Sequence, residues 1–215
     1  AHEIKNPLSS LRSASETFSR AKTAVQKKQL LGVILQDVQR LDRLITDISQ
    51  ASRVDHEIMG QNLILLDFSR LIDNFVQMRS KTYSEHRLHF DIPESPYMLR
   101  VHESRIVQVL DNILSNAISF SPKRRTIKFI LRRKASNKTV LLDIIDTGPG
   151  IPETKLETVF DRFYSERPRD ERFGEHSGLG LSIARQIVSA HNGQLTAHNQ
   201  PEGGACFRLA LPLES

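Results

Sequence analysis

The chain has 215 residues, of which 39% are hydrophobic and 26% charged, a composition typical of a folded protein with one large or two modest domains. Its single cysteine, Cys206, excludes an intrachain disulfide framework and is expected to be a small packed residue, while no run approaches the roughly eighteen apolar residues of a membrane span. The net charge of +5 comes from scattered basic residues that cluster only at 123–125 and 132–134, beside a predicted strand, so we expect solvated strand ends there and no nucleic-acid partner.

The opening residues predict a helix. Apolar and small side chains recur three and four apart from Ile4 to Phe18, which forms one stripe facing a partner helix. His2 lies off that stripe, and Glu3 is next to His2. Asn6 is one turn further along the helix, on the same polar face as His2. Pro7 lacks an N–H and clashes with a carbonyl four residues back, so we expect a bend beside these polar groups. A bend beside polar side chains suggests a functional site at this position.

A second helix is predicted over residues 26 to 54, with a wider apolar stripe than the first. Its members alternate three and four apart: Leu31, Ile34, Val38, Leu41, Ile45 and Ile48. Such a seam is typical of helices packed at coiled-coil angles. Two helices alone cover too little of it, so we predict a homodimer that forms a four-helix bundle.

Residues 53–61 lose this periodicity and contain Gly60, which predicts a boundary between a domain over 1–56 and a second over 61–215. Beyond it, strands and helices alternate. Strands are expected near 63–65, over 88–92 and 97–101, in a hairpin at 126–133 and 139–146, and in another at 194–198 and 205–211; helices are expected over 68–80, opened by Asp67, over 103–120 and over 183–191. Hairpins between helices favour an α+β layer sandwich with a mixed sheet.

Three groups of residues in this second domain suggest nucleotide binding. Asn112 and Asn116 lie four apart on one helix face, where their amide oxygens suit Mg²⁺, although such pairs are often surface residues. Asp146 follows a strand and precedes Gly148 and Gly150; its carboxylate can accept from an exocyclic amine such as adenine N6, although the same letters also fit a tight turn.

The third group is Ser177-Gly178-Leu179-Gly180, which leads into a helix whose N-terminal N–H groups suit phosphate oxygens. Between the glycine segments, residues 159–164 supply aromatic anchors, and the charged stretch 165–176 has the composition of a lid. The order of these features is more specific than any one of them.

Five segments together resemble, in order, the H, N, G1, F and G2 boxes of bacterial sensor histidine kinases: HEIKNP at 2–7, DNILSNAISFS at 111–121, DTGPGI at 146–151, FDRFY at 160–164 and SGLGLSIA at 177–184. RSASETF and QDVQRLDRLITDIS in the opening helices are similar to the alphaproteobacterial ChvG type. The resemblance implies a dimerisation and histidine phosphotransfer domain, followed by a Bergerat or GHKL-type ATP-binding domain of the kind shared with Hsp90, MutL and gyrase.

The resemblance also implies residue roles. His2 would be the phosphoacceptor, Glu3 would orient or deprotonate its imidazole, and Asn6 would position water when a partner is dephosphorylated. Asn116 would be the direct Mg²⁺ ligand with Asn112 in support. The ATP site would include Asn112, Asn116, Phe120, Asp146, Gly148, Gly150, Gly178, Leu179 and Gly180.

The sequence departs from the family pattern at two places. Ser119 and Phe120 stand where a basic residue and a tyrosine often follow the second Asn; Phe120 can still pack on adenine, but a phosphate contact is missing. Replacement cations could come from Arg162, Arg167 or Arg172. His176 replaces the usual first glycine of the G2 box, which predicts a stiffer lid.

We therefore expect a kinase core that autophosphorylates His2 with Mg-ATP and passes the phosphoryl group to an aspartate on a response-regulator receiver domain, and that also dephosphorylates it. The chain would be the cytoplasmic portion of an inner-membrane sensor. An alternative is a nucleotide-binding scaffold that acts mainly as a phosphatase, which Asn6 and Ser119 leave open. An ATPase clamp of the Hsp90 or MutL kind does not explain the opening helix pair.

Overall fold

The structure is a computed structural model that describes all residues except 1, 59–62, 92–95, 135–137, 165–177 and 215, and that leaves the side chains of residues 2–4, 40, 43 and 47–58 undescribed. The chain forms two compact units. One comprises Ala1–Ser52 with Arg162–Gly180, and the other comprises Arg53–Asp161 with Leu181–Ser215. Within the described residues, no helix is both long and apolar enough to cross a membrane.

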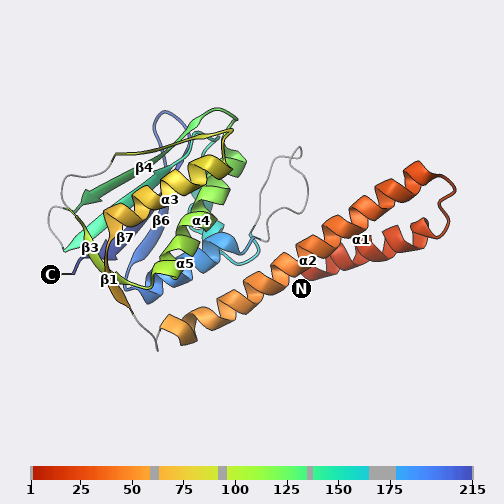
Figure 1. Ribbon diagram of the computed structural model, residues 1–215, viewed down its shortest axis with the longest axis horizontal. Coiled ribbons are helices and arrows are strands. Elements are labelled where there is room, and N and C mark those ends of the chain that lie inside the picture. Colours follow the sequence, from red (N-terminus) through yellow and green to blue (C-terminus); the bar gives the residue numbers. More distant parts are fainter. Residues whose placement is uncertain (1, 59–62, 92–95, 135–137, 165–177, 215) are drawn as a thin grey trace. The chain divides into compact units, whose positions relative to one another are not determined.

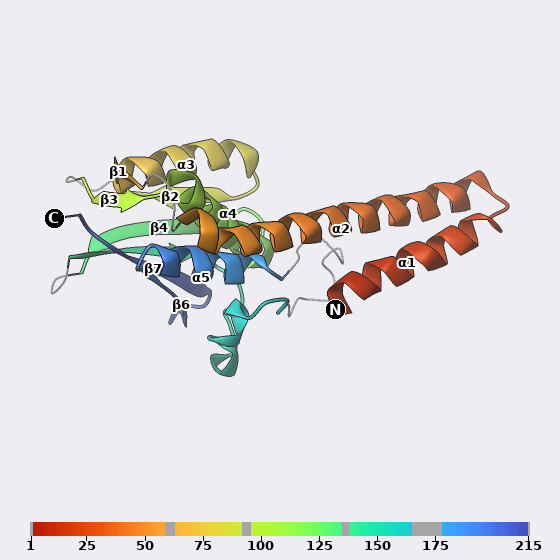
Figure 2. The same ribbon diagram turned by 90° about the horizontal axis from the view of Figure 1, so that it is seen from below.

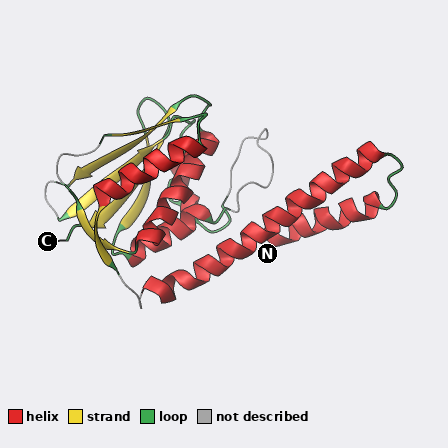
Figure 3. Cartoon of the chain, viewed as in Figure 1, coloured by secondary structure: helices red, strands yellow, loops and turns green. Residues whose placement is uncertain are grey.

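The first unit contains helix α1 (His2–Phe18) and helix α2 (Ala24–Ile58) as far as Ser52, and the two predicted opening helices run antiparallel (Figures 1 and 3). Pro7 lies inside α1. The start of α2 is a capping box, because the Gln26 N–H donates to Thr23 Oγ1 (3.2 Å) and the Thr23 N–H donates to Gln26 Oε1 (3.4 Å). This reciprocal pair explains why α2 begins two residues before the predicted start.

Apolar residues of α2 divide between two faces. Leu44 is 1% exposed and Ala14 of α1 is 6% exposed, so both side chains are buried. Other members remain between 42% and 62% exposed: Leu31, Leu35, Val38 and Ile45. A single helical hairpin therefore leaves part of its apolar stripe uncovered.

Five strands of the second unit form a mixed sheet in the order β2-β4-β5-β7-β6. They are β2 (Arg87–Phe90), β4 (Thr126–Arg133), β5 (Thr139–Ile145), β6 (Gln194–Asn199) and β7 (Ala205–Pro212). β2 is parallel to β4, and both predicted hairpins, β4–β5 and β6–β7, are antiparallel. The remaining strands, β1 (Ile64–Asp67) and β3 (Met98–Val101), pair with each other in a separate two-stranded sheet.

Helices α3 (Phe68–Thr82), α4 (Glu103–Phe120) and α5 (Gly180–Ala190) lie over one face of the five-stranded sheet (Figures 1 and 2). Asp67 caps α3 as predicted, since its carboxylate accepts from the Ser69 N–H at 3.0 Å. The six residues predicted to face inward from α4 are all buried: Ile106, Val109, Leu110, Ile113, Leu114 and Ala117. Burial of each larger side chain contributes about 1.5–3 kcal/mol, which fixes α4 firmly on the sheet.

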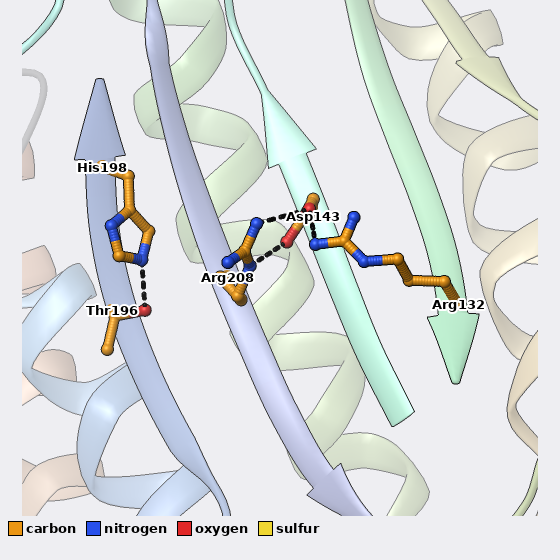
Figure 4. Close-up of polar contacts among 5 residues, drawn as sticks. All are labelled: Arg132, Asp143, Thr196, His198 and Arg208. Carbon is orange, nitrogen blue, oxygen red and sulfur yellow. Dashed lines mark hydrogen bonds and ion pairs between the residues drawn. The ribbon is translucent and has the colours of Figure 1, made fainter. Parts of the chain in front are cut away.

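The opposite face of the sheet carries an ion-pair network (Figure 4). Asp143 on β5 is only 3% exposed and accepts from Arg208 on β7 through two hydrogen bonds of 2.6 and 3.0 Å. Arg132 on β4 reaches the same carboxylate at 2.8 Å. Arg132 is exposed near the end of β4, in agreement with the expected solvated strand end, and strand pairing also brings it to a buried acid. The network ties three neighbouring strands together.

Cys206 lies on the same face of β7 and is 1% exposed, which confirms that it is a packed residue. Burial raises the pKa of its thiol to about 12. The thiol is therefore protonated and unreactive near neutral pH.

Candidate functional site

Asp146 directly follows β5 and is 3% exposed. Its Oδ1 accepts hydrogen bonds from the Gly148 N–H (2.8 Å) and the Ala205 N–H (3.0 Å). Burial raises the pKa of Asp146, and these two N–H donors partly oppose the shift. Oδ2 has no hydrogen-bond partner among the residues that the structure describes. This oxygen remains available as an acceptor for a ligand.

The loop after Asp146 lies in close contact with the C-terminal end of α4. A Cβ on Gly148 would lie 2.8 Å from the Phe120 carbonyl oxygen, closer than side chains approach backbone, so only glycine fits. The Thr147 N–H donates to Ser121 Oγ at 3.3 Å, and Ser121 is nearly buried. The predicted residues Phe120, Asp146 and Gly148 are thus brought together, although they lie on different elements.

Asn112 and Asn116 lie one turn apart on α4, and both are partly exposed. The neighbouring Asp111 accepts two hydrogen bonds from Arg79 of α3, each 2.6 Å long. Arg79 also lies over the Phe75 ring, 5.4 Å from its centroid. This bidentate pair ties α3 to the helix that carries the two carboxamides.

A buried histidine joins α5 to the start of α4. His191 Nδ1 lies 2.8 Å from the Ile187 carbonyl oxygen, which can only accept, so Nδ1 carries the proton. Nε2 is then the acceptor for the His102 N–H at 3.0 Å, at the N-cap of α4. Burial lowers the pKa of His191 below its ordinary value of 6.5. The neutral ring therefore stabilises the first turn of α4.

This arrangement predicts a pH-dependent stability contribution. As the pH falls through about 6.5, the unfolded chain takes up a proton at His191 before the folded chain does, so stability is lost until the lowered pKa of the folded state is passed. We expect the difference in unfolding free energy between the wild type and His191→Gln to be largest at pH 7.5 and smaller at pH 5.5. Urea denaturation at both pH values measures it. A difference that does not change with pH would contradict this assignment.

The aromatic segment before the G2 glycines is anchored by Phe160. Its ring is buried and packs edge-on against Phe207 of β7, with the centroids 6.2 Å apart. The Arg185 guanidinium of α5 lies over the same ring at 4.7 Å and donates to Glu157 Oε2 at 2.8 Å. The interpretation of this segment as an aromatic anchor agrees with the burial of Phe160.

Residues 178–180 lead into α5, which begins at Gly180. Gly178 has a φ of +71°, and its carbonyl accepts from the Phe163 N–H at 2.9 Å. Leu179 is 2% exposed. The helix begins three residues earlier than the predicted Ile183. Gly180 is therefore its first residue, and Gly178 lies in the segment just before it.

Comparison with known proteins assigns two parts of the sequence to known domain families. Residues 1–57 match the His Kinase A (phospho-acceptor) domain, and residues 101–215 match the histidine kinase-, DNA gyrase B- and HSP90-like ATPases. The chain belongs to the sensor histidine kinases. This membership confirms the fold predicted for both parts of the sequence, a phosphoacceptor helical region followed by a GHKL-type ATPase domain.

Similar proteins include the sensor protein ChvG of Rhizobium meliloti, 40% identical over 99% of this chain, and ChvG of Agrobacterium fabrum, 39% identical over 99%. The kinase chain spans 39% and 38% of the length of these relatives. Among solved structures, the Acinetobacter baumannii histidine kinase AdeS shares the fold with a TM-score of 0.72 at 23% identity, covering 100% of this chain and 99% of that one. Histidine kinase ThkA in complex with response regulator protein TrrA gives 0.71 at 22% identity, covering 100% and 60%.

In this histidine kinase core, His2 and Glu3 lie in the first turn of α1, and their side chains are outside the described part of the structure. Asn6 is exposed on the same helix. The lid predicted over residues 165–176, including Arg167, Arg172 and His176, also lies outside the described residues. Arg162 is described and is exposed.

Two residues beside Asp146 were missed from the sequence. Ser121 holds Thr147, and Asn199 at the end of β6 bonds Ile151. Both are small polar residues with no recurring spacing around them. Ser121 directly follows Phe120 and is the last residue of the 111–121 segment, and this position is the sequence signal that could have pointed to it.

Proposed function

We propose that this chain transfers the γ-phosphoryl group of Mg-ATP to His2 and then to an aspartate of a response-regulator receiver domain, as the cytoplasmic portion of an inner-membrane sensor. One observation carries the proposal. The chain joins a phosphoacceptor helix to an ATPase domain in which the buried Asp146 keeps one carboxylate oxygen available. The exposed remainder of the apolar stripe on α2 supports a dimer.

The nucleotide would be held by residues around Asp146. Its Oδ2 would accept from adenine N6, while Gly148 and Gly150 let the backbone approach the base and Phe120 packs beside it. The N–H groups at the start of α5, around Gly178, Leu179 and Gly180, would bind phosphate oxygens because a helix N-terminus favours negative charge.

Asn116 is our candidate for the direct Mg²⁺ ligand, with Asn112 in support. Both carboxamides lie on one face of α4 and are partly exposed, and amide oxygens suit a hard cation that also touches phosphates. Among the described residues, no group of three His, Cys, Asp or Glu side chains could hold a metal ion. Bound Mg²⁺ would neutralise charge on the transferring phosphates.

At the phosphoacceptor, a neutral imidazole nitrogen of His2 would attack the γ-phosphorus, forming a P–N bond as the bond to the β–γ bridging oxygen breaks and ADP leaves. The Glu3 carboxylate would accept the proton of the other ring nitrogen and fix its tautomer. When the chain acts as a phosphatase, Asn6 would position the water that hydrolyses the phosphoryl group of the response regulator.

The deciding experiment follows the phosphoryl group. The purified chain is incubated with γ-labelled ATP and Mg²⁺, and then with a receiver domain. We expect an acid-labile, alkali-stable label on the chain that moves to the receiver domain. A wild-type chain that binds ATP and takes up no label would contradict the kinase function.

A second candidate function is a nucleotide-dependent phosphatase, favoured by the exposed Asn6 on α1 and by Ser119 in place of a basic residue. It is tested by measuring phosphate loss from a phosphorylated receiver domain with and without nucleotide. Rapid loss together with weak labelling of the chain would favour this reading.

The dimer is tested at Ile45, which is 62% exposed while its neighbour Leu44 is buried. Ile45→Glu places a charge on the uncovered stripe, so we expect light scattering to show a shift from dimer to monomer with the helix content unchanged. Gln29→Glu, at an exposed polar position of α2, should remain dimeric. An Ile45→Glu chain that stays fully dimeric would show that the stripe is not the interface.

A further inference from the structure

Asn199, the last residue of β6, holds the end of the loop that follows Asp146. Its Oδ1 accepts from the Ile151 N–H at 2.8 Å, and its Nδ2 donates to the Ile151 carbonyl oxygen at 2.7 Å. Nδ2 also donates to Glu153 Oε1 at 3.0 Å. The carboxamide thus pairs with both backbone groups of Ile151, as a neighbouring strand would.

The first and last residues of this loop, Asp146 and Ile151, are both held by the paired ends of β6 and β7. Ala205, which donates to Asp146 Oδ1 at the entry, is the register partner of Asn199, which binds Ile151 at the exit. The paired ends of β6 and β7 therefore carry both anchors. Because strand pairing fixes their separation, the loop between them is held at a set span.

The hydrogen bonds of Asn199 to Ile151 and Glu153, which we call the clamp, also explain why residue 150 is a glycine. Its φ is +80°, and a Cβ there would lie 2.9 Å from Asn199 Oδ1. Only glycine combines this backbone conformation with such a close approach. Asn199 uses its acceptor and one donor on Ile151 and its other donor on Glu153, so it acts on a ligand only through the loop.

We propose that Asn199 is a positioning residue for nucleotide binding, which holds the 146–151 loop in its binding shape before the nucleotide arrives. This inference rests on the proposed ATP-binding function. A loop that is ordered in the free protein loses little conformational freedom on binding, whereas a released loop must be ordered by the nucleotide. Loss of the clamp therefore weakens ATP binding and leaves the chemical step at saturating ATP unchanged.

Asn199→Asp is the sharpest test because it keeps the shape and the acceptor for the Ile151 N–H. The new carboxylate cannot donate and faces both the Ile151 carbonyl and Glu153. We expect the Kd for ATP, measured by calorimetry, to rise about tenfold and the KM for autophosphorylation to rise with it. The autophosphorylation rate at saturating ATP should stay within about twofold of wild type.

Glu153→Gln is the matched control, because its side chain can still accept from Asn199, and its Kd should equal that of the wild type. The double variant Asn199→Asp/Glu153→Gln removes the repulsion between carboxylates but not the loss at the Ile151 carbonyl. The double variant should still bind ATP more weakly than the wild type. Full recovery in the double variant would overturn the clamp and assign the effect to charge repulsion.

The outcomes separate the two levels of the proposal. A wild-type chain that does not bind ATP overturns the proposed function itself. A wild-type chain that binds ATP, with Asn199→Asp binding equally well, overturns only the positioning role. Hydrogen exchange in the nucleotide-free wild type gives a check that needs no variant: the Ile151 amide should be protected, and rapid exchange there would overturn the clamp.

Discussion

The His2→Gln chain is expected to bind ATP with wild-type affinity and to incorporate no acid-labile phosphate. Glutamine retains length, polarity and helix propensity in the first turn of α1. Its amide nitrogen has no available lone pair, so it cannot attack phosphorus as a neutral imidazole does. Labelling with γ-labelled ATP and calorimetry on the same preparation measure the two properties separately.

A second histidine provides the control. His198 is exposed on β6, and its Nε2 lies 2.9 Å from Thr196 Oγ1 (Figure 4). His198→Gln should retain full labelling, because this residue has no place in the proposed transfer. Labelling of His2→Gln at the wild-type rate would remove His2 from the mechanism, whereas loss in both variants would point to damaged folding instead.

Features with a local signal were predicted well. The buried face of α4 follows from the spacing of six apolar residues, and the cap at Asp67 follows from a single side chain reaching two residues along the chain. The turn after Asp146 is also local, since Asp146 bonds the N–H of Gly148 two residues away. In each case the partners lie within a few positions of one another, where periodicity and residue type carry the information.

Features that depend on contacts between distant parts of the chain could not be predicted. Asn199 lies 48 positions from Ile151, and Ser121 lies 26 positions from Thr147. Arg132 meets Asp143 only because β4 and β5 pair in one particular register. The separate pairing of β1 with β3 is another long-range outcome. No local pattern encodes these contacts, so the residues that position the loop were missed while the loop itself was found.

Asp146→Asn is expected to weaken ATP binding about a hundredfold while preserving the fold. The amide oxygen can still accept from the Gly148 and Ala205 N–H groups, at present 2.8 and 3.0 Å away. These two donors fix the orientation of the amide, because a flipped amide would place donor against donor. Its NH₂ group then stands where Oδ2 was and faces the adenine N6 amine, which is also a donor. Calorimetry measures the affinity, and thermal unfolding shows whether the fold is preserved.

The same substitution should change which base is preferred. Inosine triphosphate presents an oxygen at position 6, which can accept from the new NH₂ group but would meet the wild-type carboxylate as a second acceptor. The wild type should therefore prefer ATP, and Asp146→Asn should prefer inosine triphosphate, because a site built to pair with one group rejects its opposite strongly. Loss of both nucleotides together with a lowered melting temperature would indicate only a structural role for Asp146. Unchanged preference for ATP in a folded variant would show that another group recognises adenine.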